Sequence, residues 1–124
     1  MLNKTHVEHF FITLGVDFAL WFVTLPLQAY LPPEAWFGLA PPQIAFVALV
    51  LVGLPVVGVF IGREMAQHSY KLALSRGWSW GETMPVKWYE GLTTGWTPDS
   101  VLDVLSSVVA YLLLLFLGYL LFLM

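Results

Sequence analysis

The stretch SVVAYLLLLFLGYLLFLM, residues 107–124, decides the fold, because it is almost wholly apolar and carries no charged side chain. A helix needs about 20 predominantly apolar residues to cross roughly 30 Å of hydrocarbon. Extended back to Ser100, this stretch reaches that length. We therefore predict a membrane-spanning helix over about 100–124.

Two further apolar runs precede it, over about 9–30 and 43–62. Within a bilayer the backbone must satisfy its own hydrogen bonds, so unbroken apolar runs of this length form helices. The sequence thus predicts an all-α integral membrane protein with three helices and a single domain, residues 1–124. The first run lacks a small-x-small cleavage site and contains Asp17, so we do not expect it to be a cleaved signal peptide.

The composition agrees with a membrane protein. Hydrophobic residues make up 59% of the chain and charged residues only 10%, whereas soluble domains carry about 25% charged residues. The net charge of -3 argues against a nucleic-acid partner. Because cysteine is absent, disulfides and thiolate metal sites are excluded.

The basic residues predict the orientation. All five lie before the first span or between the second and the third: Lys4, Arg63, Lys71, Arg76 and Lys87. The connector 31–42 has none and is rich in proline, so we expect it to contain no helix. By the positive-inside rule the N-terminus and segment 63–98 are cytoplasmic and the C-terminus is outside. We expect a multi-pass protein of the bacterial inner membrane.

Segment 63–98 is expected to have two parts. Its first part contains good helix formers, so the second span should continue as a helix until Gly77. The rest is rich in tryptophan, which favours the headgroup layer, so we expect an amphipathic segment along the inner leaflet. Its anchors would be Trp78, Trp80, Trp88 and Trp96. Thr97 and Pro98 predict the N-terminus of the third span.

Polar residues recur at helical spacing within the spans. At 100° per residue, one arc of the first span collects His6, His9, Thr13, Asp17, Thr24 and Gln28. The third span similarly aligns Ser100, Asp103, Ser107, Tyr111 and Gly118. We expect these polar faces to pack together, with Gly58, Gly62, Ser107 and Gly118 as packing positions, since small residues allow close approach of helices. Pro26 and Pro55 should kink their helices.

The predicted topology brings titratable residues to one depth on the cytoplasmic side. The candidate metal ligands are His6, His9, Glu64, His68 and Asp103, which could hold a divalent ion such as zinc or manganese. Alternatively, these groups form an acid–base site, with Glu64, Asp103 and the deeper Asp17 as candidate catalytic carboxylates. The third alternative is hydrogen bonding between helices.

Three motifs resemble small uncharacterised membrane proteins of tailed bacteriophages and prophages: Val7-Glu8-His9-Phe10, Gly62-Arg63-Glu64-Met65-Ala66-Gln67 and Asp99-Ser100-Val101-Leu102-Asp103. This resemblance implies a phage gene and the bacterial inner membrane. A more distant similarity is to the VanZ-like family, whose early histidine, E-x-x-Q stretch and Asp-led final span correspond to His9, Glu64, Gln67 and Asp103.

Three functions follow from these observations. The sequence favours a non-enzymatic protein that acts by helix packing, as a homo-oligomer or with another membrane protein, because no nucleophile with a base and oxyanion donors is evident. The second is a holin that oligomerises through the polar faces and lyses the host. The third is a membrane-embedded enzyme or metal protein acting on lipid headgroups, in which Arg63 holds a phosphate.

Overall fold

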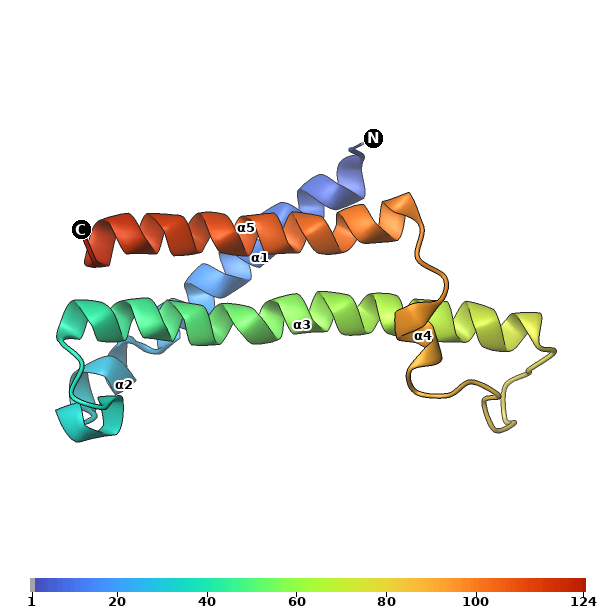
Figure 1. The fold of residues 1–124 in the computed structure, drawn as a ribbon, viewed down its shortest axis with the longest axis horizontal. Coiled ribbons are helices and arrows are strands. Elements are labelled where there is room, and N and C mark those ends of the chain that lie inside the picture. Colours follow the sequence, from blue (N-terminus) through green and yellow to red (C-terminus); the bar gives the residue numbers. More distant parts are fainter. Residues whose placement is uncertain (1) are drawn as a thin grey trace.

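The protein is all-helical in the computed structural model, which describes residues 2–124. Its long helices are α1 (Lys4–Val23), α3 (Pro41–Ser75) and α5 (Pro98–Phe122), and its short ones are α2 (Leu25–Tyr30), α4 (Glu90–Thr93) and the 3₁₀ helix η1 (Pro33–Trp36). Figure 1 shows α3 and α5 side by side and antiparallel, with α1 crossing them obliquely. The N-terminus lies near the start of α5, at the opposite end from the C-terminus.

Three helical segments are long and apolar enough to cross a membrane: Lys4–Tyr30, Pro41–Ser75 and Pro98–Phe122. Within residues 2–124, the predicted three helices of membrane-spanning length and apolarity are therefore confirmed. In the first segment the helix breaks at Thr24, and Pro26 lies in the first turn of α2. α3, in contrast, runs through Pro55 without interruption.

The helix ends follow their capping residues. Asn3 caps α1 by accepting from the backbone N–H of His6 at 3.1 Å. Thr97 caps α5 by accepting from the backbone N–H of Ser100 at 3.1 Å, and Pro98 occupies the first turn, as predicted. α3 continues well past the apolar run and ends before Gly77, whose φ of +80° suits glycine.

The connector before α3 contains a short helix that was not expected. Its prolines were expected to exclude a helix, but one 3₁₀ turn forms over Pro33–Trp36. Proline is tolerated in the first turn of a helix because the N–H that it lacks has no partner there.

The segment between α3 and α5, which was expected to be an amphipathic segment along the inner leaflet, is irregular except for α4, which packs against α3. Trp78 is only 8% exposed, and its indole N–H donates to the carbonyl of Glu82 at 2.9 Å. Trp80 and Trp88 remain 79% and 81% exposed. Trp78 is thus a packing residue of this segment, and the anchor role fits Trp80 and Trp88.

Two close approaches hold the long helices together. A Cβ added at Gly53 of α3 would collide with the ring of Tyr111 of α5, and one at Gly118 would lie 2.6 Å from Leu49. Gly118 therefore packs as predicted. Gly58 and Gly62 are exposed and have no neighbour within 4 Å of an added Cβ, so their predicted packing within the bundle is wrong.

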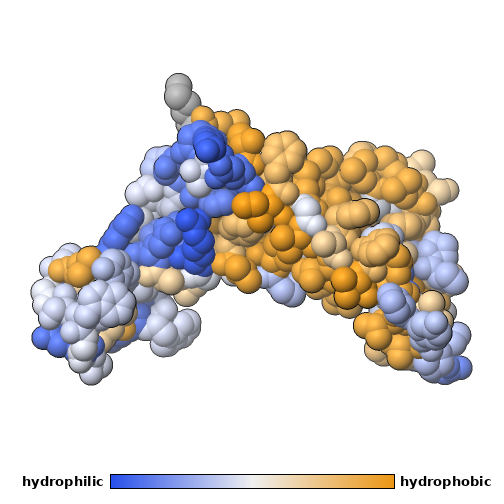
Figure 2. All heavy atoms as spheres, turned by 180° about the vertical axis from the view of Figure 1, so that it is seen from behind, coloured by the Kyte–Doolittle hydropathy of each residue, from blue (hydrophilic) through white to orange (hydrophobic). Residues whose placement is uncertain are grey.

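The hydropathy of the surface changes along the length of the molecule. Figure 2 shows hydrophobic residues covering most of the bundle, and hydrophilic residues gathered at the end that carries the segment between α3 and α5. The starts of α1 and α5 lie at this same end (Figure 1). The candidate site lies where these two surfaces meet.

Candidate functional site

Two histidines of α1 meet two aspartates of α5 in a group that we call the His–Asp cluster: His6, His9, Asp99 and Asp103. Nε2 of His6 lies 3.2 Å from Oδ1 of Asp99 and 3.6 Å from Oδ1 of Asp103. Nδ1 of His9 lies 3.2 Å from the same Asp103 oxygen. Both histidines are buried, being 1% and 7% exposed. One carboxylate oxygen of Asp103 is therefore shared by two imidazoles.

The other ring nitrogens fix the tautomers of the two histidines. The backbone N–H of Asn3 donates to Nδ1 of His6 at 3.0 Å, so a neutral His6 carries its proton on Nε2. Arg63 of α3 can only donate, and its Nη1 lies 3.2 Å from Nε2 of His9. A neutral His9 therefore carries its proton on Nδ1. Each histidine directs its N–H toward a carboxylate of α5.

This proton arrangement bears on the predicted metal site. Within residues 2–124, no three His, Asp or Glu side chains are placed to hold a metal ion. The five predicted ligands separate into a set between α1 and α5 and the pair Glu64–His68 on α3. In the first set, the nitrogens that face Asp103 carry the protons of the neutral tautomers, so a metal would bind there only after these protons shift or leave. The predicted five-ligand zinc or manganese site is not formed.

Three atoms of the His–Asp cluster are buried without a hydrogen bond: Nε2 of His6, Nδ1 of His9 and Oδ1 of Asp103. They lie at ion-pair distances, but their alignment falls short of hydrogen bonding. A buried polar atom without such a bond costs about 1–3 kcal/mol. A cluster that served only to join helices would be expected to satisfy these atoms, so the arrangement favours a functional role.

His9 lies in a line between Asp103 and Arg63. The carboxylate faces one ring nitrogen, and the guanidinium covers the other. Arg63 has a side chain 45% exposed and also lies 3.6 Å from Oε1 of the buried Glu64. A histidine oriented by a carboxylate is the arrangement used in general acid–base catalysis. If the half-exposed Arg63 moved to bind an anion, Nε2 of His9 would be open to that anion.

The Glu64–His68 pair of α3 contacts the segment before α5. Nε2 of His68 lies 3.7 Å from Oε2 of Glu64, and Nδ1 lies 3.0 Å from the carbonyl of Gly91. The imidazole also packs edge-on against Trp96, with ring centroids 4.9 Å apart. His68 and Trp96 therefore fasten the segment before α5 to α3.

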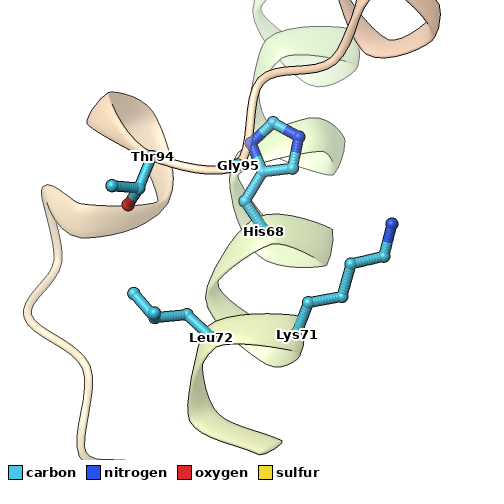
Figure 3. A pocket seen from close by; sticks show the side chains of 5 residues that line it. All are labelled: His68, Lys71, Leu72, Thr94 and Gly95. Atoms are coloured by element: carbon cyan, nitrogen blue, oxygen red, sulfur yellow. The ribbon is translucent and has the colours of Figure 1, made fainter. Parts of the chain in front are cut away.

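A small pocket of about 220 Å³ lies beside His68 (Figure 3). Its other lining residues are Lys71, Leu72, Thr94 and Gly95. An added Cβ on Gly95, whose φ is +90°, would lie 3.1 Å from the His68 side chain. The pocket thus marks where the chain crosses close over α3, and it contains none of the carboxylates of the site.

A polar ladder continues from the His–Asp cluster into the apolar part of the bundle. The Thr13 hydroxyl donates to the carbonyl of His9 at 2.8 Å, and it lies 2.8 Å from the Ser107 hydroxyl of α5. Asp17, one turn further, is fully buried. The polar face predicted for the first span therefore packs against α5, except that Thr24 and Gln28 are half-buried and hydrogen-bonded to each other.

Two residues were not predicted from the sequence: Asn3 fixes the tautomer of His6, and Gly53 receives Tyr111. Asp99, which belongs to the Asp99–Asp103 motif noted in the sequence, contacts the same ring as Asn3. For Asn3 a signal was available, because asparagine is a favoured N-cap and its side chain bonds three residues onward. The Gly53 contact had no local signal, since it depends on how two distant helices cross.

Comparisons with protein-family models, with curated proteins and with solved structures give no significant match to the chain. The site is therefore interpreted from its own geometry.

Proposed function

We propose that this chain is a multi-pass protein of the bacterial cytoplasmic membrane that binds a phosphate-bearing lipid headgroup, with His9 as a general base toward the bound group. The observation that carries this proposal is the line Asp103–His9–Arg63. Guanidinium groups match phosphate oxygens in charge and in geometry. Arg63 supplies a guanidinium group beside His9, the base that Asp103 already orients.

The depth of the site supports a headgroup as the ligand. Arg63 contacts His9 near the starts of α1 and α5, at the end of the bundle (Figure 1) where hydrophilic residues gather (Figure 2). Phosphates of a bilayer lie where its hydrophobic part gives way to water. All five basic side chains belong to segments at this end, so the positive-inside rule assigns it to the cytoplasm.

The chemistry then follows from three side chains. Arg63 turns from His9 to the phosphate, which frees the lone pair on Nε2. His9 takes a proton there from a water or hydroxyl as its oxygen forms a new bond to phosphorus, while Asp103 stabilises the imidazolium through Nδ1–H. The same proton passes to the leaving alcohol oxygen as its bond to phosphorus breaks, so the histidine returns to its neutral form.

The test compares two cations of α3. Arg63→Gln should weaken binding of a short-chain phosphatidylglycerol about tenfold or more, because a hydrogen bond to a charged group contributes about 1.5–3 kcal/mol. Lys71→Gln removes the same charge two turns further along α3 and should change binding little. Equal losses in both variants would mean general attraction of anions and would contradict a built site. Binding would be measured by calorimetry in a neutral detergent.

The base is tested separately from binding. His9→Gln should bind the same lipid but lose the release of its headgroup, measured by phosphorus NMR of lipid in nanodiscs. Binding without turnover in the unchanged protein would refute the role of His9 as a base.

A second candidate function is assembly with another membrane helix, supported by the exposed Gly58 and Gly62. A helix can approach such a face closely, and among residues 2–124 no atom lies within 4 Å of a Cβ added at either glycine. Gly58→Leu should then reduce dimers detected by cross-linking in membranes. A holin would have to use a different surface from the predicted one, because the polar face of α1 is buried against α5; timed lysis on expression tests this alternative.

A further inference from the structure

The interface of α1 and α5 holds a carboxyl group deep in the apolar part of the bundle. Asp17 is 0% exposed, and neither of its side-chain oxygens has a hydrogen bond. It follows His9 by eight residues, which places it about 12 Å further along the helix. The proposed headgroup chemistry does not use this carboxyl.

The surroundings of Asp17 offer no counter-charge. No ion pair found in the described chain includes it. Tyr111 of α5 is the titratable group near it, but that hydroxyl donates to the carbonyl of Val50 of α3 at 2.8 Å. On α3, Arg63 is directed to His9 and Glu64. Toward the hydrophilic end, His9 lies two turns earlier on α1, where it contacts Asp103.

A carboxylate cannot keep its charge without a partner in such a place, because burial of an unpaired charge is far more costly than protonation. From this geometry we propose that Asp17 is a proton-binding site inside the membrane, loaded from the His–Asp cluster along the α1–α5 interface. This inference goes beyond the proposed headgroup function and depends neither on Arg63 nor on a lipid.

Two hydroxyls mark the proposed route. Thr13 lies one turn from His9 and one turn from Asp17 on α1, and its hydroxyl bonds to the carbonyl of His9 and lies 2.8 Å from the Ser107 hydroxyl. A hydroxyl accepts one proton while it gives up another, so it can pass a proton without holding a charge. Each loading event takes one proton from water at the hydrophilic end and places it on a carboxylate oxygen of Asp17.

The experiment is infrared spectroscopy of the full-length protein in nanodiscs. The unchanged protein should show the carbonyl band of a protonated carboxyl, and Asp17→Asn should lose that band. Glu8→Gln is the matched control, because Glu8 is half-exposed and paired with Lys4. This variant should keep the protonated-carboxyl band of the unchanged protein. Absence of the band from the unchanged protein, or its survival in Asp17→Asn, would overturn the proposal.

Two further measurements keep the proposal testable if Asp17→Asn does not fold. Carbon-13 labelling of the carboxyl groups of the three aspartates should shift the band in the native sequence. After transfer to heavy water, the band should shift as the proton is replaced. Thr13→Val with Ser107→Ala should delay that replacement. Unchanged replacement kinetics in the double variant would overturn the route through the two hydroxyls.

Discussion

Nδ1 of His9 lies 3.2 Å from Oδ1 of Asp103, although the two residues are separated by most of the chain. The contact exists because α1 and α5 begin at the same end of the bundle (Figure 1). The position of Arg63 on the far side of the ring then determines which nitrogen of His9 holds the proton. Three helices thus cooperate to orient one imidazole.

Asp103→Asn tests the value of this contact for the fold. The amide keeps the shape of the carboxyl but removes the charge that faces two imidazole N–H groups. We expect a loss of about 1–3 kcal/mol in stability, because the two buried imidazoles lose the carboxylate charge that lies 3.6 Å and 3.2 Å from their ring nitrogens. Unfolding in detergent at neutral pH would measure it, with Asp99→Asn, which is largely exposed, as the milder control. Equal effects of the two substitutions would contradict the central role of Asp103.

The arrangement of protons in the His–Asp cluster predicts how the protein responds to metal removal. Since the nitrogens that face Asp103 carry protons, a chelator should leave the unfolding temperature unchanged. Added zinc at concentrations near that of the protein should not raise it, whereas binding to the native state alone would do so. A rise that disappears in His9→Gln would restore the metal site predicted from the sequence.

The spans could be predicted from the sequence because membrane helices follow from local properties, namely apolar length and the position of caps. α5 therefore begins after its cap Thr97, and α3 ends just before Gly77, as expected. The grouping of His6, His9 and Asp103 also followed from the helical spacing of polar residues, together with the predicted topology.

What could not be predicted depends on how the helices rotate and cross. The G-x-x-x-G spacing indicated Gly58 and Gly62, yet α3 presents Gly53 to α5. Gly53 and Gly58 differ by about 140° around a helix, so only one of them can face a given neighbour. Similarly, composition alone could not separate Trp78, which is buried and donates to the carbonyl of Glu82, from the exposed Trp80.

Gly53→Ala tests the crossing of α3 and α5 directly. The added methyl group would collide with the Tyr111 ring, so we expect a loss of about 1–3 kcal/mol from overpacking. Gly58→Ala is the matched control, since its methyl would meet open space and alanine favours the helix. Thermal unfolding in one detergent should separate the two variants. A double variant, Gly53→Ala with Tyr111→Leu, should recover part of the loss if the ring is the cause.

The Arg76–Glu90 pair predicts a pH dependence outside the membrane. Hydrogen bonds from the Arg76 guanidinium, and then from the backbone N–H of Lys87, lower the pKa of the Glu90 carboxyl below its usual value. The stabilisation is therefore complete above the ordinary pKa of glutamate and is lost as the pH falls through the lowered value. Protease cleavage between α3 and α4 should increase between about pH 5 and pH 3. Glu90→Gln should be cleaved readily at both pH values, and a variant that kept the same increase would contradict this explanation.

Trp80 and Trp88 should enter the headgroup layer, whereas Trp78 should not. The indoles of Trp80 and Trp88 are exposed, whereas Trp78 is buried and its N–H donates to the carbonyl of Glu82. Variants that retain one of these three tryptophans, with the other five of the six replaced by phenylalanine, would be placed in bilayers with lipids brominated near the headgroup. Quenching should be strong for Trp80 and Trp88 and weak for Trp78. Strong quenching of Trp78 alone would mean that the segment opens on the membrane and lies along it, as the amphipathic pattern of the sequence first indicated.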